Sequence, residues 1–240
     1  MDRVLADFVK EEAPVFYWSI LFAPADKRDA LLSLYAFALE IKRIPKLVSE
    51  PALGEIRMQW WVDGLKGERV AELRSHPFGA ALINTCTSYS LPREPLVDLI
   101  EARVQLNQTD PETLPDEAAL ELFCGRCHAT LIHCAVLILN DGRMSPTSEA
   151  AGHAGMVIGL MELLREDVFS ISHNDLTALA REHLIKTRLL MRDIPKRLHP
   201  AFLPLVSAEP FLNNIEQGVP SHRSDPSSMR VLWRMMGGAL

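Results

Sequence analysis

Three positively charged side chains stand close together in the segment EIKRIPKL, residues 40–47. Lys42 and Lys46 are four residues apart, so in a helix they share one face, and Arg43 lies beside them. Ammonium and guanidinium groups bind phosphate and other anions directly, without a metal ion. Cations also stabilise the C-terminal end of a helix, where the backbone carries partial negative charge. The segment therefore indicates either an anion-binding site or a helix end.

The segment CGRCH, residues 124–128, matches the C-x-x-C-H pattern of haem attachment, and its Cys and His side chains are also zinc ligands. It lies within a long apolar run, ALELFCGRCHATLIHCAVLIL, in which Cys127, Leu131 and Cys134 share one helix face. Small thiol side chains on an apolar face are typical of a protein core. We therefore predict structural cysteines here, and neither haem nor a bound metal.

No Gly-rich phosphate loop and no G-x-S-x-G segment occurs in the sequence, so patterns of nucleotide binding and of serine hydrolysis are absent. Glycines recur in GHAGMVIG, residues 152–159, within a helical pattern. Their spacing favours close packing against a neighbouring helix over phosphate binding, because glycine has no side chain to hold the neighbour away.

The charge of the chain argues against a nucleic-acid-binding function, since the formal net charge is -6 over 240 residues. From Arg181 onward, nine Lys and Arg accompany five Asp and Glu, whereas the preceding part carries a net charge of -10. This basic third indicates a contact with anionic lipid, a contact with an acidic partner, or solvated surface. The N-terminus lacks the features of a secretion or transit signal, and no uncharged apolar run is long enough to span a membrane. We expect a cytoplasmic protein of a bacterium.

Helical periodicity runs through the chain, and the alternation typical of strands is almost absent. Five apolar residues recur three and four apart in the first long helix, at Leu31, Leu34, Tyr35, Phe37 and Ile41. Pro45 should end or kink that helix. The predicted helices cover residues 26–48, 53–66, 77–89, 94–107, 115–139, 147–166, 174–192, 200–216 and 226–236.

Helices joined by short connections predict one all-α domain over residues 1–218. Residues 219–240 begin with the Pro- and Ser-rich segment VPSHRSDPSS and end with the amphipathic segment MRVLWRMMGGAL. We predict a linker and a short C-terminal amphipathic helix there. That helix is suited to a membrane surface, to a groove in a partner, or to packing on the core.

Several segments between about residues 14 and 166 resemble the squalene/phytoene synthase family, and they come in the family's order. They are FYWSILFAPADKRDALLSLYAFALEIKRIPKL, RMQWWVDGL, HPFGAALI, LPREPLVDLIEAR, ALELFCGRCHATL and AGMVIGLMELLRE. The resemblance implies a helical bundle of the isoprenoid-synthase type around a central cavity. The family's enzymes join two prenyl diphosphates, and two aspartate-rich helix segments hold the Mg²⁺ ions that bind the diphosphate groups.

The acidic segments of the family are altered in this chain. Lys42, Arg43 and Lys46 stand where the first segment has its carboxylates, and a cation offers Mg²⁺ no lone pair. In the second segment Arg165 is retained, Glu166 replaces the first aspartate, and Ser170 replaces the last. The resemblance therefore points to a non-catalytic branch of the family, which includes an assembly factor for respiratory complex I. We expect no metal site and no cofactor.

We accordingly predict an inactive synthase-like protein that helps to assemble or stabilise a membrane complex of the complex I type. Its partners would be a protein of that complex and an isoprenoid or other anionic lipid, and it would contact the inner membrane peripherally. For such a lipid, Lys42, Arg43, Lys46 and Arg165 would contact phosphate. Arg57, Trp60 and Trp61 would line the mouth of the cavity.

The alternative is an active prenyl-diphosphate synthase or transferase of isoprenoid biosynthesis with relocated Mg²⁺ ligands. The candidates are Glu40, Glu162, Glu166 and Asp167, of which Glu162 and Glu166 share one helix face. This alternative requires these carboxylates to meet across the cavity.

Overall fold

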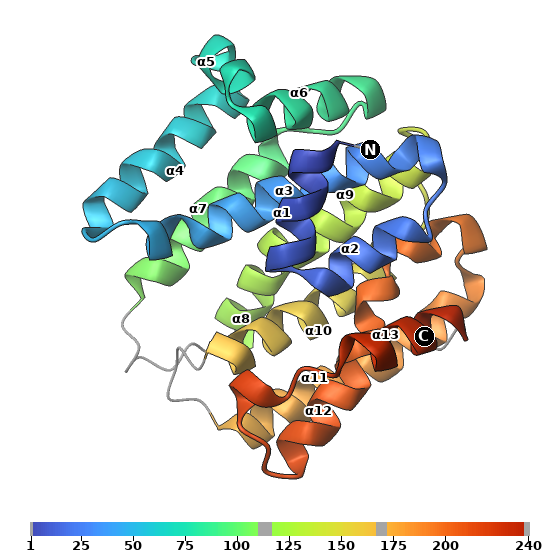
Figure 1. The fold of residues 1–240 in the computed structure, drawn as a ribbon. Coiled ribbons are helices and arrows are strands. Elements are labelled where there is room, and N and C mark those ends of the chain that lie inside the picture. The colour runs from blue at the N-terminus through green and yellow to red at the C-terminus, as the bar shows by residue number, and fades with distance from the viewer. Residues whose placement is uncertain (1, 110–116, 167–171, 238–240) are drawn as a thin grey trace. The chain divides into compact units, whose positions relative to one another are not determined.

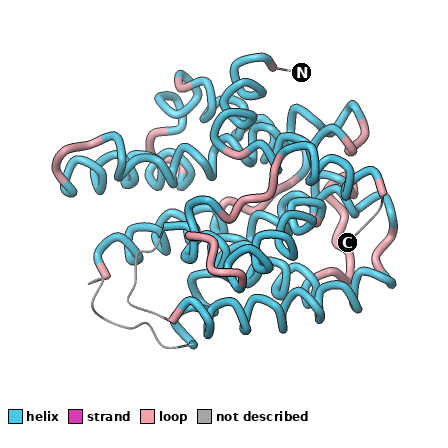
Figure 2. Tube along the Cα trace, turned by 60° about the horizontal axis from the view of Figure 1, so that its bottom comes forward, coloured by secondary structure: helices cyan, strands magenta, loops and turns pink. Residues whose placement is uncertain are grey.

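The computed structural model describes residues 2–109, 117–166 and 172–237, most of which lie in helices (Figure 1). No β-strand occurs in these three ranges, as the tube drawing in Figure 2 also shows. The prediction of an all-α protein is therefore confirmed. Asp167 and Ser170, two positions of the second altered segment, lie outside the described residues.

The chain divides into two compact units. The N-terminal unit comprises residues 1–108 and 134–145, and the C-terminal unit comprises residues 109–133 and 146–240. The N-terminal unit contains α1 (Arg3–Glu12), α2 (Pro14–Leu21), α3 (Arg28–Arg43), α4 (Pro51–Lys66), α5 (Val70–Ser75), α6 (Pro77–Tyr89), α7 (Glu94–Gln108) and most of α9 (Thr130–Leu139). The C-terminal unit contains α8 (Glu117–Cys124), α10 (Ser148–Glu166), α11 (His173–Leu190), α12 (Ala208–Glu216) and α13 (Ser228–Met236). The separation of residues 1–218 from 219–240 as domains stays a prediction.

Helix α3 supplies much of the core of the N-terminal unit. Its five predicted apolar positions, 31, 34, 35, 37 and 41, are each at most 3% exposed. The helix ends at Arg43 and continues as a 3₁₀ turn over Ile44–Leu47. The prediction for Pro45 is thus confirmed, because proline has no N–H to donate and disfavours helical geometry in the residue before it.

The apolar run around CGRCH forms α8, a π-helical turn over Gly125–Ala129, and α9. All four cysteines lie in the described ranges, are buried and form no disulfide, which confirms that they are core residues. By length and hydropathy, the stretch Ala118–Leu139 is sufficient to cross a membrane. However, 67% of its most apolar window is buried inside the protein, as in the core helix of a globular protein.

Helix α10 packs closely against residues 124–129 at two of its glycines. A Cβ atom added to Gly155 would lie 2.5 Å from the backbone nitrogen of Ala129. One added to Gly159 would lie 2.4 Å from the sulfur of Cys124. Both distances are far below van der Waals contact, so the close-packing interpretation is confirmed at these two positions. At Gly152 an added Cβ would meet no neighbouring atom of the described residues within 4 Å.

Helices α10 and α11 also meet at a pair of histidines. The Nδ1 atoms of His153 and His183 are 2.9 Å apart. One ring must donate this hydrogen bond and the other must accept it, so at least one of the two is neutral. Burial lowers the pKa of His183, and the neighbouring His153 and Lys186 lower it further, whereas Glu182 and Glu121 act in the opposite direction.

Some elements differ from the predicted ones. Helices α1, α2 and α5 were not predicted, because they are short or show only a few buried positions. The predicted helix 200–216 is α-helical only from Ala208, since Pro200 and Pro204 lie in two 3₁₀ turns before it. The C-terminal helix α13 begins at Ser228, two residues later than predicted.

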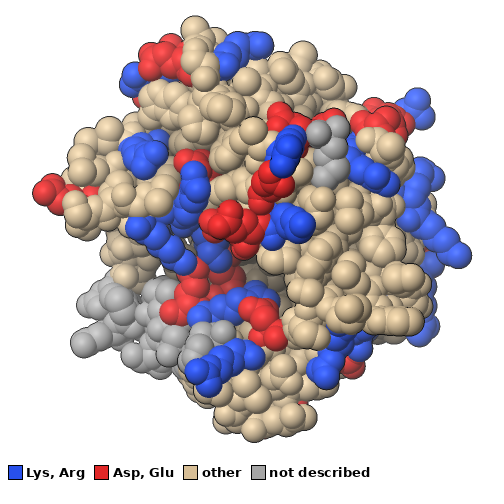
Figure 3. All heavy atoms as spheres, in the orientation of Figure 1, with Lys and Arg blue, Asp and Glu red and all other residues tan. Residues whose placement is uncertain are grey.

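Charged side chains of both signs occupy the surface. On the face drawn in Figure 3, Lys and Arg are interspersed with Asp and Glu.

Candidate anion-binding pocket

The N-terminal unit contains a pocket of about 500 Å³. Its lining includes Glu40 of α3, Arg57, Trp60 and Trp61 of α4, Arg69, and His76 at the start of α6. The three residues predicted from the sequence to line the mouth of a cavity, Arg57, Trp60 and Trp61, therefore do lie in one pocket.

An aromatic cluster forms one wall of the pocket. The Trp60 and Trp61 rings meet edge to face with their centroids 5.5 Å apart, and the His76 ring lies 5.2 Å from that of Trp61. Adjacent helix residues point about 100° apart, so the two tryptophans face different directions. Trp61 is turned inward, is 2% exposed and packs on Phe37. Trp60 is half-buried, and its Nε1 donates a hydrogen bond of 3.3 Å to Glu72. The two tryptophans thus have different roles, one in the core and one at the pocket.

The carboxylate of Glu40 is already bound by a cation of the same helix. Glu40 is only 2% exposed, and its Oε2 accepts a hydrogen bond of 2.6 Å from Nε of Arg43. The Arg43 guanidinium also lies over the Phe8 ring, 4.6 Å from its centroid. A buried carboxylate needs such a partner, since an isolated buried charge costs several kcal/mol. Arg43 therefore neutralises Glu40.

His76 is a neutral member of the pocket. Burial lowers the pKa of His76, and the cations Arg57 and Arg43 lower it further, whereas Glu40 acts in the opposite direction. Its Nδ1 accepts a weak hydrogen bond of 3.4 Å from the backbone N–H of Gly79, which caps α6. The ring is thus fixed with its Nδ1 toward the helix.

The two arginines of the lining, Arg57 and Arg69, differ in what they contact. Arg69 donates to Glu72 at 3.1 and 2.6 Å, so its charge is matched by a carboxylate. Arg57 is exposed and makes no ion pair with any residue in the described ranges. A guanidinium beside aromatic and aliphatic side chains can hold the phosphate of an amphiphilic ligand while the apolar part packs on Trp60 and Ile56.

Lys42 and Lys46 are not part of this pocket lining. Lys42 lies half-buried in the last turn of α3, and Lys46 lies exposed in the following 3₁₀ turn. Of the three cations of EIKRIPKL, only Arg43 reaches the pocket, through Glu40. The interpretation of the two lysines as cations at a helix end agrees with their positions.

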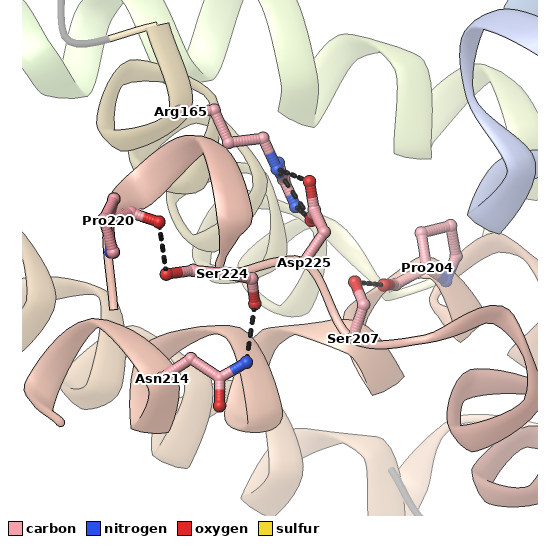
Figure 4. Close-up of polar contacts among 7 residues, drawn as sticks. All are labelled: Arg165, Pro204, Ser207, Asn214, Pro220, Ser224 and Asp225. Carbon is pink, nitrogen blue, oxygen red and sulfur yellow. Dashed lines mark hydrogen bonds and ion pairs between the residues drawn. The ribbon is translucent and has the colours of Figure 1, made fainter. Parts of the chain in front are cut away.

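Arg165, the remaining predicted cation, binds a carboxylate within the C-terminal unit. Its guanidinium donates to Asp225 at 2.8 to 3.1 Å (Figure 4). The same guanidinium lies over the Phe211 ring. The loop carrying Asp225 is held by Asn214, whose side chain donates to the backbone oxygen of Ser224 at 2.9 Å. Sequence patterns carry no signal for this pair, because its members are 60 residues apart.

The acidic candidates are divided between the two units, with Glu40 in the N-terminal unit and Glu162 and Glu166 in the C-terminal unit, so a Mg²⁺ site shared by them stays a prediction. Glu162 is 6% exposed and lies 3.8 Å from Nε2 of His128, Glu166 is the half-buried last residue of α10, and Asp167 is outside the described ranges. No group of three or more His, Cys, Asp or Glu side chains in the described ranges could hold a metal ion. The segment EIKRIPKL has one carboxylate, Glu40, which binds Arg43, and its other charged side chains are cations with no lone pair for a metal ion. These residues do not fit Mg²⁺.

Comparison with known proteins gives one family. The model of the squalene/phytoene synthase family matches residues 9–168. A crystal structure of a dehydrosqualene synthase in complex with ligand superposes with a TM-score of 0.75 at 16% sequence identity, covering 98% of this chain and 95% of that one. At this identity the superposition shows the fold, and the predicted helical isoprenoid-synthase fold is confirmed.

Two mammalian proteins are similar to this chain over most of its length. "NADH dehydrogenase (ubiquinone) complex I, assembly factor 6" of Bos taurus is 24% identical over 252 aligned residues, which cover 90% of this chain and 74% of that protein. The protein of the same name from Homo sapiens is 22% identical over 234 aligned residues, covering 84% and 69% respectively.

Proposed function

Because the chain belongs to the squalene/phytoene synthase family, we propose that it is a non-catalytic member that acts in the assembly of a respiratory complex of the NADH dehydrogenase type. The relatives named as complex I assembly factors support this role. Its place of action would be the cytoplasmic face of the inner membrane of a bacterium.

The observation that carries the proposal is the pairing of Glu40 with Arg43 within EIKRIPKL. Synthases of this family need carboxylate oxygens in this segment to bind Mg²⁺ and neutralise diphosphate. This chain supplies cations there, and its one nearby carboxylate binds Arg43 instead. Assembly does not require that chemistry, so the altered segment is compatible with an assembly role.

We further propose that the pocket beside Trp60 binds the phosphate end of an isoprenoid or other anionic lipid without a metal ion. Arg57 would contact the phosphate, and the exposed Ile56 and the Trp60 ring would contact the chain. The pocket volume of about 500 Å³ is within the range of small-molecule sites.

The assembly role is tested by deleting the gene from its host and restoring it on a plasmid. We expect membranes of the deletion strain to lose NADH:quinone oxidoreductase activity and fully assembled complex on native gels, and the plasmid to restore both. An unchanged amount of assembled complex in the deletion strain would exclude the assembly role.

The ligand proposal is tested by calorimetric titration with a non-hydrolysable farnesyl diphosphate analogue, in Mg²⁺ and separately in EDTA. We expect equal affinity in both buffers. Replacing Arg57 with Gln should weaken binding about ten-fold, because a charge-assisted hydrogen bond to phosphate is lost. Arg74→Gln, a change of the same kind at an exposed position outside the lining, should have no effect.

The buffers also separate the two functions kept open by the sequence. Binding that requires Mg²⁺ would contradict the metal-free pocket. It would favour an active prenyltransferase whose Mg²⁺ ligands are Glu40, Glu162, Glu166 and Asp167. Absence of binding in both buffers would contradict the lipid pocket and leave the assembly role to be decided by the deletion strain.

A further inference from the structure

The outer face of α13 exposes three large apolar side chains. Met229, Trp233 and Met236 are 67%, 69% and 72% exposed. Their spacing of four and three residues places them on one side of the helix, where they form a continuous apolar stripe. Exposing a tryptophan and two methionines together is unfavourable in water. Apolar patches of this kind mark surfaces that bind a partner or a membrane.

The helix cannot bury this stripe by turning toward its own protein. Its opposite face is already packed, since Val231 is 0% and Met235 3% exposed. Arg234 fixes the rotation of the helix by donating to Glu209 of α12 at 2.5 Å. The stripe therefore faces away from the C-terminal unit.

Positive charge lies along one flank of the stripe. Arg230 is exposed on the same helix and follows directly after Met229. Glu209 binds two cations at once, Arg234 of α13 and Arg188 of α11, at 2.5 and 3.0 Å. Both arginines lower the pKa of the Glu209 carboxyl, so this acid remains ionised and yet neutralises only one of its two partners.

Helix α11 also exposes apolar side chains near Arg188. Ile185 lies three residues before Arg188 and Leu189 directly after it, and these two side chains are 58% and 54% exposed. Beyond the end of α11, Arg192 and Lys196 are exposed as well. The segment from Arg181 onward carries nine Lys and Arg against five Asp and Glu, so its surface has a net positive charge.

We propose that the outer face of α13 docks on the surface of an anionic lipid bilayer. Trp and Met side chains enter the boundary between headgroups and acyl chains, while neighbouring arginines stay at the depth of the lipid phosphates. With nine residues, α13 is too short to span a bilayer and lies along its surface.

Charge favours lipid over a protein groove as the occupant. A bilayer rich in anionic lipid presents phosphate along the whole flank of the helix and so complements Arg230 and the excess charge near Glu209. This docking is independent of the assembly role and of the pocket, which lies in the other unit.

The test is flotation of the full-length protein with vesicles of equal parts phosphatidylglycerol and phosphatidylcholine, compared with vesicles of phosphatidylcholine alone. We expect binding to the anionic vesicles, weakened by added salt, and little binding to the neutral ones. Trp233→Ser should weaken binding about ten-fold through lost apolar burial. Arg230→Gln should weaken it about five-fold, the effect of one cation near an anionic leaflet.

The control variant is Met144→Ser in the N-terminal unit, which removes an 82% exposed methionine and should leave vesicle binding unchanged. Circular dichroism checks that each variant is folded. If Trp233→Ser does not fold, Arg230→Gln still tests the proposal. Wild-type protein that stays unbound by anionic vesicles, or variants that bind like wild type, would overturn the proposal. So would light scattering that shows a dimer split by Trp233→Ser, because a second copy would then cover the stripe.

Discussion

At the scale of single residues, the pair of Glu40 and Arg43 explains how a cationic segment can adjoin a buried core. The carboxylate is 2% exposed, and Arg43 both binds it and covers the Phe8 ring. The pair resembles that of Glu72 and Arg69 in spacing and in its shortest distance, 2.6 Å, but Glu72 is exposed. The two pairs therefore differ mainly in burial.

This difference predicts unequal effects of removing each arginine. Arg43→Ala should lower the free energy of unfolding by about 2 kcal/mol, because it leaves a buried carboxylate without its partner. Arg69→Ala should cause little measurable change, because water replaces the lost partner at an exposed site. Urea unfolding of both variants measures the difference, and equal losses would contradict the role assigned to burial.

At the scale of elements, the glycines of α10 set how closely this helix approaches residues 124–129. Gly155→Ala should destabilise the protein by about 2 kcal/mol, since the new Cβ would lie 2.5 Å from the Ala129 nitrogen and the helices must separate. Gly152→Ala, in the same helix, should stabilise it by about 0.5 kcal/mol, because alanine loses less backbone entropy and meets open space.

Thermal and urea unfolding of these two variants would check the opposite signs. A Gly155→Ala protein as stable as wild type would mean that α10 and its neighbour are not in the close contact described. A destabilised Gly152→Ala protein would mean that this part of α10 packs against a further element.

Sequence patterns predicted the long elements well because apolar spacing is strong in them. Helix α3 has five buried positions that recur three and four apart, and a proline directly after it ends the helix. By contrast, α1 has only three buried residues in ten, Leu5, Ala6 and Val9, and its pattern is correspondingly weak. Between Pro200 and Ser207 the sequence is apolar apart from Ser207, so this part of the two 3₁₀ turns before α12 was taken for a helix.

At the scale of the whole molecule, the sequence could predict fold and pocket residues but not the long-range pairs. Arg57, Trp60 and Trp61 lie within one turn and a half of α4, so their proximity follows from a local pattern. The partner of Arg165 is Asp225, and His76 joins the tryptophans from another element. Such contacts depend on tertiary packing, which single-sequence periodicity does not contain.

The pair of His153 and His183 predicts how the stability of the molecule depends on pH. The pKa of His183 is below the usual value of 6.5, so between 6.5 and its lower folded value only the unfolded state takes up a proton there. Above pH 6.5, His183 adds no pH dependence to the free energy of unfolding. Below pH 6.5, the free energy of unfolding falls as the pH falls. The melting temperature should therefore drop from about pH 7.5 to about pH 5.

His183→Gln should make this drop smaller, because the residue that resists protonation is gone. His199→Gln is the matched control in the same unit, since within the described residues the His199 ring hydrogen-bonds to the backbone oxygen of Ile194 and not to another titratable side chain. Melting curves at both pH values test the prediction, and an equal drop in all three proteins would assign the pH dependence to other groups.

The burial of every cysteine has a practical consequence for labelling. Burial raises the pKa of Cys86 to about 11 and that of Cys134 to about 12, and Cys124 and Cys127 are also shielded from solvent. Maleimides react with accessible thiolates, so the native protein should remain almost unmodified. A cysteine introduced at Met229 would then be selectively reactive, and a fluorophore attached there could report the depth of α13 in a bilayer without prior removal of any native thiol.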